Sequence, residues 1–432
     1  MKRVLVIAYY WPPSGGSGVQ RWVKFVKYLP SEGWEPVVFA PRGADYPIRD
    51  TSLNAEVPAS VEVLRGRIWE PYAAYRQLLG GKDASTQVTE ISSGKKTVKQ
   101  KLALWIRANL FVPDPRVSWV KPSVKTLQKY LKEHPVDAIV TTGPPHSVHL
   151  IGLRLHQLTG TPWISDFRDP WTRMYYLKYL PMLSSTRRSL QKMEQEVLDQ
   201  STVVLTCTPM VQEDFRTRTK TPVECITNGF DEKDFAGEAP KGDGLFNITH
   251  TGLLAADGNP QELWKVLGRL AVSVPGFREE LRIRLVGKVD QEVLDSLAAA
   301  GLSENVVLLG PQKHAQAVRE QRSASLLLLP LRNDEQYAPI LPGKLFEYLA
   351  ARRPILGVGQ EEGAMAQLIF KARAGITADW ENPAPMQAFI ANAWRQHCGG
   401  GIPATDGDIT PYTRQNLTKE LAQLLEKVSE NE

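Results

Sequence analysis

The sequence predicts an α/β protein of two doubly wound domains, each built on a parallel sheet covered by helices. A chain of 432 residues is too long for one ordinary core and suits two domains of about 200 residues. Short apolar runs with the length of buried strands alternate with helical stretches, which is typical of parallel sheets. This alternation restarts near residue 240, after a linker at 238–244 that contains Pro and Gly.

The first domain is expected to span residues 1–238. Its opening run, 3–8, is continuously apolar, as in a strand that is covered on both faces. A glycine-rich turn, a helix and a second strand at 36–40 follow and complete a βαβ unit. Further strands are predicted at 61–64, 138–142, 163–165 and 203–206, and the polar stretch 80–101 predicts a mobile loop.

The second domain is expected to span residues 245–405. Strands are predicted at 246–249, 281–286, 306–309 and 326–329, each followed by a turn residue and then by a helical stretch. The remaining residues, 406–432, contain one amphipathic helix over 412–428, with Leu417, Leu421, Leu424 and Leu425 on one face.

Composition excludes several classes of protein. No run reaches the roughly 18 apolar residues that a membrane-spanning helix needs. The three cysteines are widely spaced, so neither a disulfide framework nor a zinc site is indicated, and we expect no metal. We therefore expect a soluble cytoplasmic protein.

The net charge of +5 is unevenly distributed, with +8 in residues 1–240 and −3 in the rest. Such asymmetry suggests an anionic partner for the first domain. The basic residues are scattered and not interleaved with aromatic ones, so we expect no nucleic acid. An anionic membrane surface or a phosphorylated acceptor fits better. Residues 98–112 combine apolar residues on one helical side with flanking lysines, as in an interfacial helix on the inner face of the cell membrane, although a core-packed helix has a similar pattern.

Four loops follow predicted strands, at the edge where open α/β sheets bind ligands. The first contains Gly15, Gly16 and Gly18. The third glycine of a dinucleotide-binding G-x-G-x-x-G pattern would fall on Arg21, so a nicotinamide dinucleotide is disfavoured. The loop can still present backbone amides and a helix N-terminus to a phosphate, and the alternative is a tight turn alone.

The second and third loops supply the candidates for catalysis. His146 follows a strand end and two prolines, so we expect it to contact acceptor or donor sugar, with a structural role as the alternative. Asp166, Arg168 and Asp169 lie directly after another strand. Two carboxylates and a guanidinium can orient sugar hydroxyls or position an acid/base group, and the alternative is an ion-paired loop.

The fourth loop opens a helix with Pro342 and Gly343, followed by Lys344 and, one turn on, Glu347. Free amides and a lysine at a helix start suit a diphosphate, and a carboxylate on the same face can reach an adjoining ribose. This is the most specific pattern in the chain, and its alternative is an ordinary capped helix.

Three motifs together resemble those of GT-B-fold retaining glycosyltransferases of family 4, in the bacterial branch that makes surface polysaccharides and lipid-linked glycans. They are residues 10–22 (YWPPSGGSGVQRW), 166–171 (DFRDPW) and 342–348 (PGKLFEY). The resemblance implies two Rossmann-like domains facing across a cleft, with a C-terminal helix that crosses back to the first domain. It implies a UDP-, GDP- or other nucleotide-diphosphate sugar as donor, a glycan or lipid-linked acceptor on the first domain, and no required cofactor or metal.

Carried over to this chain, the resemblance places Gly16 opposite the donor diphosphate and Gly252 at the head of the corresponding loop of the second domain. It assigns phosphate to Gly343 and Lys344, and the ribose to Glu347. Two departures stand out. Many relatives have a second Glu where this chain has Pro339, and the loop 253–259 lacks their basic residue, which leaves Lys344 and Arg21 to neutralise the diphosphate.

The resemblance also implies a front-face displacement without a protein nucleophile. The departures keep two alternatives open: a non-catalytic GT-B protein that binds glycan or a partner, and an enzyme like the UDP-sugar 2-epimerases.

Overall fold

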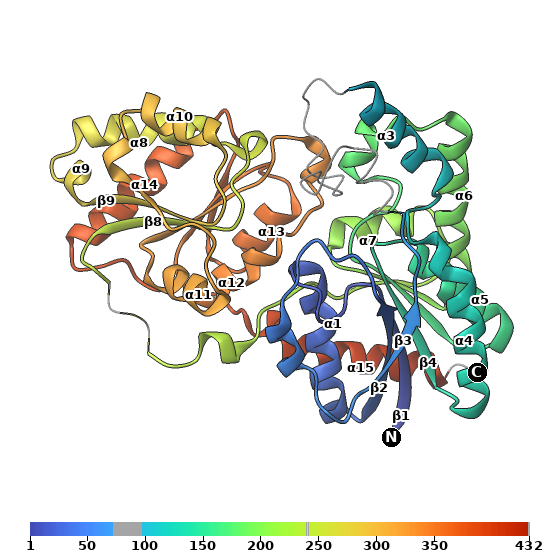
Figure 1. The fold of residues 1–432 in the computed structure, drawn as a ribbon. Helices are drawn as coiled ribbons and strands as arrows, with labels where there is room; N and C mark the ends of the chain where they lie inside the picture. Colours follow the sequence, from blue (N-terminus) through green and yellow to red (C-terminus); the bar gives the residue numbers. More distant parts are fainter. Residues whose placement is uncertain (72–96, 239, 241, 431–432) are drawn as a thin grey trace. The chain divides into compact units, whose positions relative to one another are not determined.

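The chain folds into two compact units, each with its own parallel sheet (Figure 1). The computed structural model describes residues 1–71, 97–238, 240 and 242–430. The first unit comprises Met1–Thr227 and Arg414–Glu432, and the second comprises Asn228–Thr413. The predicted α/β class with two doubly wound domains is therefore confirmed. The chain leaves the first unit after Thr227, whereas the sequence suggested that the first domain ends at residue 238.

The sheet of the first unit has seven strands in the order β3-β2-β1-β4-β5-β6-β7, and all neighbouring strands are parallel. The strands are β1 (Lys2–Ala8), β2 (Trp34–Arg42), β3 (Glu62–Arg67), β4 (Ala138–Gly143), β5 (Trp163–Phe167), β6 (Val203–Thr206) and β7 (Val223–Cys225). The helices are α1 (Ser17–Tyr28), α3 (Val98–Leu110), α4 (Val120–Glu133), α5 (Ser147–Thr159), α6 (Ser184–Gln200), α7 (Pro209–Arg216) and α15 (Arg414–Glu430).

Strand β1 shows why this sheet is buried on both faces. Val4 and Val6 pack into a core formed with α1 and α15, whereas Leu5 and Ile7 pack into a second core formed with α4 and α5. A strand turns successive side chains to opposite faces, so a strand covered on both sides must be continuously apolar.

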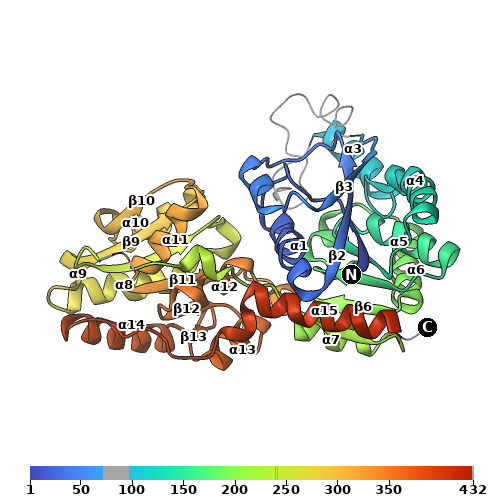
Figure 2. The same ribbon diagram turned by 90° about the horizontal axis from the view of Figure 1, so that it is seen from below.

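The last helix, α15, completes the first of these cores. Its leucines at 417, 421, 424 and 425 are buried together with residues of β1 and α1. Figure 2 shows this helix running along the first unit, although it comes last in the chain. The apolar face expected at 412–428 is therefore the face by which this helix is held.

The second sheet has six parallel strands in the order β10-β9-β8-β11-β12-β13. The strands are β8 (Phe246–Thr251), β9 (Leu281–Val286), β10 (Val306–Leu308), β11 (Leu326–Pro330), β12 (Ile355–Val358) and β13 (Gly375–Ala378). The helices are α8 (Gln261–Ser273), α9 (Phe277–Glu280), α10 (Gln291–Ala299), α11 (His314–Ser323), α12 (Gly343–Ala351), α13 (Ala364–Lys371) and α14 (Pro383–Cys398).

In both sheets the strand order reverses next to the first strand of the unit, between β1 and β4 in one and between β8 and β11 in the other. Such switch points open a crevice at the carboxyl ends of the strands, because the adjoining connections leave toward opposite faces. The four loops that the sequence singled out follow β1, β4, β5 and β11, so all of them lie at this edge of their sheets.

Some expectations need correction or lie outside the described residues. Residues 80–96 of the expected loop are not described, and residues 98–101 form the first turn of α3, which Thr97 caps through the backbone of Gln100. Strands β7, β12 and β13 were not expected. Among the described residues, no helix is both long and apolar enough to cross a membrane.

Candidate functional site

A cavity of about 480 Å³ lies within the first unit, at the carboxyl ends of its central strands. Its walls come from the glycine loop after β1, the loop after β2, the end of α3, and the loops after β4 and β5. Its apolar lining residues include Phe111, Leu177, Leu180 and Met182. The cavity is therefore formed by three of the loops that the sequence marked as candidates, together with the loop after β2 and the end of α3.

The glycines of the first loop are required by close packing. A side chain on Gly15 would meet Ile48, and one on Gly18 would meet the Arg168 guanidinium at 2.7 Å. Gly16 has a φ of 88°, which favours glycine, and it precedes α1 without a capping side chain. The Val19 amide donates to the Gly16 carbonyl oxygen at 3.3 Å, and no side chain caps the amides before it, which a phosphate could therefore meet.

Arg168 holds this edge of the sheet together. Its guanidinium donates hydrogen bonds to the carbonyl oxygens of Gly18, Gly143 and Pro144, at 2.6, 3.1 and 2.7 Å. The side chain also lines the cavity. Because carbonyl oxygens carry no net charge, the guanidinium remains a source of positive potential at the cavity wall while it fixes two loops.

His146 is a buried imidazole whose two ring nitrogens have no hydrogen-bond partner among the described residues. Its ring stacks on Trp171, with centroids 5.0 Å apart and an interplanar angle of 7°. Burial, followed by the nearby His149 and Arg168, lowers the pKa of His146 well below its usual value. The ring is therefore neutral and lines the cavity, and its one donor and one acceptor are not used by any described residue.

Asp169 is half-buried and also lines the cavity. Burial raises its pKa, and this effect exceeds the opposing influence of Arg168. A carboxyl group with a raised pKa at a cavity wall is suited to accept a hydrogen bond or a proton from a hydroxyl.

Two of the expected site residues lie elsewhere. We expected Arg21 to neutralise a diphosphate and Asp166 to act in catalysis, but their side chains form an ion pair with exposures of 1% and 0%, at 3.1 Å. Asp166 also accepts hydrogen bonds from Trp22 and Thr142. All of the polar groups of this pair face protein, so its position supports a structural role in joining α1 to β5.

Several charged residues of the cavity were not predicted from the sequence. Arg107 comes from α3, and Arg116 pairs with Glu70 at 3.2 Å. Asp114 accepts hydrogen bonds from the amide and hydroxyl of Ser147 at the start of α5. The run Pro113-Asp114-Pro115-Arg116 could have been noticed as a stiff charged turn, but nothing local shows that it packs beside the loop after β4.

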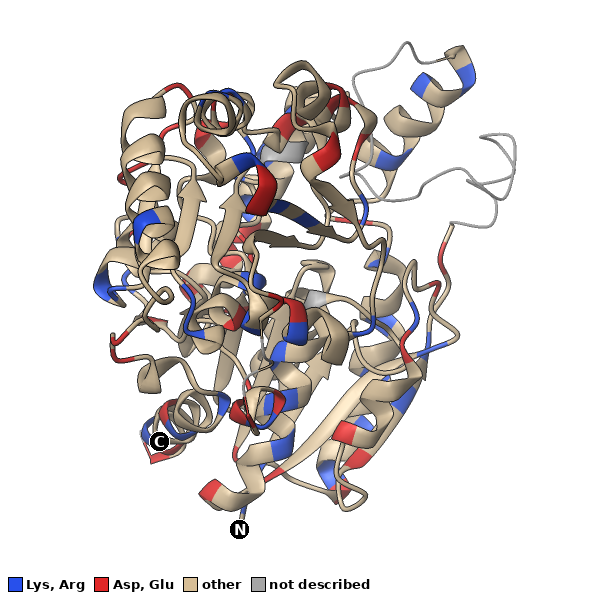
Figure 3. Cartoon of the chain, turned by 90° about the vertical axis from the view of Figure 1, so that its left-hand side faces the viewer, with Lys and Arg blue, Asp and Glu red and all other residues tan. Residues whose placement is uncertain are grey.

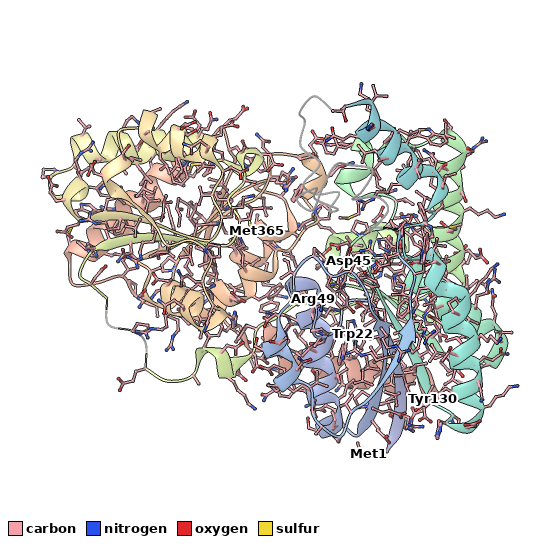
Figure 4. All side chains as sticks on the ribbon, in the orientation of Figure 1. Met1, Trp22, Asp45, Arg49, Tyr130 and Met365 are labelled. Atoms are coloured by element: carbon pink, nitrogen blue, oxygen red, sulfur yellow. The ribbon has the colours of Figure 1, made fainter. Side chains whose placement is uncertain are left out.

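Asp45 is another missed wall residue, and it lies beyond the carboxyl end of β2 (Figure 4). Its position was predictable in principle, because loops after parallel strands meet at one edge. The second strand was expected to end at residue 40, where Pro41 and Arg42 follow in place of an acidic residue, so Asp45 was not assigned to that strand end.

In the second unit, the loop after β8 and the start of α12 meet. Gly252 has a φ of 106°, and a side chain there would come within 2.5 Å of the Lys344 ammonium nitrogen. Burial lowers the pKa of Lys344 to about 8, opposed by the charge of Glu347. The Lys344 side chain thus lies against the Gly252 turn, which has no side chain, and beside the amides at the N-terminus of α12.

Glu347 lies on the next turn of α12, with 24% of its side chain exposed. Its Oε2 accepts a hydrogen bond from Gln321 Nε2 at 2.8 Å, and its Oε1 lies 3.8 Å from His314 Nδ1. The structure therefore brings together Gly252, Gly343, Lys344 and Glu347, all within one unit. Among the described residues, no group of three or more His, Cys, Asp or Glu could hold a metal ion.

The loop 253–259 has no basic residue of its own, but a basic residue from another loop lies beside it. Arg332, which follows β11, pairs with Asp257 at 2.7 Å. A guanidinium therefore lies beside this loop although the sequence of the loop contains none.

The comparisons with known proteins agree with this architecture. Residues 15–229 match a family described as a glycosyl transferase 4-like domain. No curated protein sequence matches the chain significantly.

Solved structures match over nearly the full length of the chain. The N-terminal domain of trehalose-6-phosphate phosphatase from Candida albicans has a TM-score of 0.64 at 13% identity, covering 99% of this chain and 97% of that chain. A UDP-forming α,α-trehalose-phosphate synthase from Burkholderia vietnamiensis has a TM-score of 0.62 at 12% identity, covering 100% of both. Sucrose-phosphate synthase from Thermosynechococcus elongatus has a TM-score of 0.58 at 12% identity, covering 99% and 96%. Sequence identities this low support a common fold but do not indicate which substrate this chain uses.

Proposed function

Because the chain is a glycosyltransferase of the GT-B fold with a glycosyl transferase 4-like first domain, we propose that it moves a sugar from a nucleotide-diphosphate donor to a glycan or lipid-linked acceptor. The transfer retains the anomeric configuration and serves the assembly of surface polysaccharides or lipid-linked glycans. UDP- and GDP-sugars are the first donors to consider.

The observation that carries this proposal is the cluster at the start of α12. Lys344 and the free helix amides offer positive charge to a diphosphate, and Gly252 leaves room beside them. Glu347 lies one turn further along the same helix, so its carboxylate can accept hydrogen bonds from the ribose of a nucleotide whose diphosphate lies at the start of α12. No other group of described residues combines these three properties, and a protein that only bound glycan would not require them.

The cavity of the first unit fits an acceptor. Sugars are bound by aromatic faces together with a few hydrogen-bonding groups, and the cavity offers Trp171, Tyr10, His146 and Asp169. Its apolar lining residues suit the lipid portion of a lipid-linked acceptor. The amides at the start of α1 and the Arg168 guanidinium suit a phosphate of such a molecule.

In this mechanism the protein positions the reactants and stabilises charge. Lys344 and the α12 amides stabilise the leaving diphosphate, whose oxygen takes the proton of the attacking acceptor hydroxyl. His146, held neutral by burial, donates or accepts a hydrogen bond at a sugar hydroxyl. Asp169 orients the acceptor, and no side chain forms a covalent bond with the sugar.

We further propose that the first unit binds an anionic membrane surface through α3. The helix turns Ala103, Leu104 and Ala108 inward. It leaves Leu102 and Leu110 53% and 65% exposed, so the alternative of a core-packed helix does not describe these side chains. Figure 3 shows basic but no acidic residues on α3, which carries Lys99, Lys101 and Arg107. Exposed apolar and cationic side chains on one helix favour the interface of an anionic bilayer on the cytoplasmic side.

The donor is tested by thermal unfolding of the protein with a panel of nucleotide sugars, because a ligand of the native state raises the unfolding temperature. We expect one or a few UDP- or GDP-sugars to stabilise the protein, and transfer from that donor to give a product whose anomeric configuration, read by NMR, matches the donor. If no nucleotide sugar stabilises the protein, the proposal is refuted. If the sugar is converted without any acceptor, an isomerising enzyme replaces it.

The membrane surface is tested by co-sedimentation with phosphatidylglycerol vesicles at low salt. The double variant Leu102→Asp/Leu110→Asp is expected to lose most of the binding shown by the natural sequence. Val272→Asp, which changes an 81% exposed residue of the second unit, serves as the control and is expected to bind normally. Absence of binding by the natural sequence would remove the membrane from the proposal and leave the transferase intact.

A further inference from the structure

A buried glutamine that the sequence analysis did not notice contacts Glu347. Gln321 lies on α11 and is 0% exposed. Its Nε2 donates one hydrogen bond to Glu347 Oε2 at 2.8 Å and another to Thr251 Oγ1 at 3.2 Å. One amide group thus joins α12 to the last residue of β8.

The hydrogen bonds from Gln321 form a chain in which each side chain donates to the next. The hydroxyl of Thr251 lies 3.3 Å from that of Tyr348, and the Tyr348 hydroxyl donates to the carbonyl oxygen of Leu328 at 3.4 Å. The Tyr348 oxygen also accepts from the Thr251 amide at 2.8 Å. A carbonyl at one end and a carboxylate at the other can only accept, so Gln321 must turn both of its N–H groups into the network.

This orientation leaves Gln321 Oε1 buried and without a hydrogen-bond partner among the described residues. Turning the amide over would give Oε1 a place in the network but would set it against the Glu347 carboxylate, with two acceptors facing one another. The arrangement that leaves one acceptor unsatisfied is therefore the one that holds Glu347.

The network also reaches the phosphate side of the proposed donor site. Thr251 directly precedes Gly252, the turn against which the Lys344 ammonium lies. Glu347 Oε1 is left beside His314 Nδ1 at 3.8 Å, on the partly exposed side of the carboxylate. The groups proposed for ribose and for phosphate are consequently linked through one buried side chain.

We propose that Gln321 is a positioning residue of the nucleotide site, which holds the Glu347 carboxylate in the orientation that receives a ribose and ties it to the turn at Gly252. The inference rests on the proposed function, because it assumes that Glu347 binds the donor. Gln321 itself is buried and contacts the ligand only through Glu347 and Thr251.

The test compares two changes at 321 with a matched change on the same helix. Gln316 also donates its side-chain amide to a glutamate, Glu320, at 3.1 Å, but far less of it is buried. Binding of UDP and of GDP is measured by titration calorimetry for the natural sequence and for Gln321→Leu, Gln321→Glu and Gln316→Glu. Inorganic pyrophosphate is the probe for the phosphate side alone.

Gln321→Leu is expected to weaken binding of the nucleotide by roughly tenfold, the effect of losing a hydrogen bond to a charged group. Pyrophosphate binding is expected to change less than about twofold, since Lys344 is retained. Gln321→Glu sets two carboxyl groups side by side that share one proton at low pH. Its affinity relative to the natural sequence should therefore fall by at least about tenfold from pH 5 to pH 8, whereas that of Gln316→Glu stays constant.

Two outcomes overturn the inference and differ in what else they overturn. If Glu347→Ala loses nucleotide binding while both variants at 321 bind as the natural sequence does at every pH, Gln321 is not a positioning residue and the proposed donor site stands. If the natural sequence binds neither UDP nor GDP, or Glu347→Ala binds them unchanged, the proposed function itself fails. Should Gln321→Leu not fold, the pH profile of Gln321→Glu decides.

Discussion

Each unit has an arginine or lysine and a carboxylate near its switch point, and the two pairs differ in what their charges face. In the first unit, Arg21 and Asp166 face each other at 1% and 0% exposure. In the second, Lys344 and Glu347 lie on one helix, and Glu347 keeps 24% of its side chain exposed. A charge after a strand thus indicates the edge of the sheet where ligands bind, whereas the groups that it meets in the folded unit decide whether it is available to a ligand.

The largest expected effect is on stability and comes from breaking the buried pair. Arg21→Met leaves the Asp166 carboxylate without its cation, which costs about 3–5 kcal/mol when the partner stays buried. Urea unfolding of the variant measures this loss. Lys265→Met, which removes an exposed ion pair with Glu262, is the control and should cost under about 1 kcal/mol. If Arg21→Met lowers the free energy of unfolding as little as Lys265→Met does, the Arg21–Asp166 pair is not structural.

Glu347→Ala is expected to weaken binding of the donor by roughly tenfold to a thousandfold with the fold intact, because each charge-assisted hydrogen bond contributes about 1.5–3 kcal/mol. Titration calorimetry with UDP and GDP measures the change, and Glu304→Ala, an exposed change in the same unit, is the control. Comparable affinity in both variants would make the helix structural only and would remove the contrast between the units.

Lys344 should make donor binding depend on pH. Burial lowers its pKa to about 8, so the ammonium form that attracts a diphosphate is lost as pH rises from 7 to 9. The affinity for UDP or GDP should fall by about tenfold across this range. Lys344→Arg keeps its charge and should abolish the fall. A flat profile for the natural sequence would show that the ammonium group does not contact phosphate.

The smallest expected effect concerns His146. His146→Phe keeps a ring that can stack on Trp171 but removes both nitrogens, which should lower kcat/KM for transfer by several-fold, the value of one neutral hydrogen bond. His134→Phe, an exposed change in the same unit, is the control. Because the pKa of His146 lies well below its usual value, its loss should not alter the pH profile between 6 and 8. A new pH dependence would assign this histidine a proton-transfer role instead.

The sequence predicted the two-sheet fold and the edge of each sheet that carries the candidate residues, because buried parallel strands are continuously apolar and loops after them share one edge. It missed β12 and β13, which have four residues each and lack a period that separates them from helix. It gave no indication of Gln321, since only the packing of α11 against β8 and α12 brings that amide to Glu347. Nor could it distinguish Arg21 from a ligand-binding arginine, because burial depends on the whole unit.

The return of α15 to the first unit has a consequence for how the protein is made. The second unit is in effect inserted into the first, between β7 and the helix that closes the core around Leu417 and Leu421. A ribosome therefore finishes every residue of the second unit before it delivers the last piece of the first. During that interval α15 cannot cover the apolar side chains of β1 and α1, so the first unit to be started is the last to complete its core.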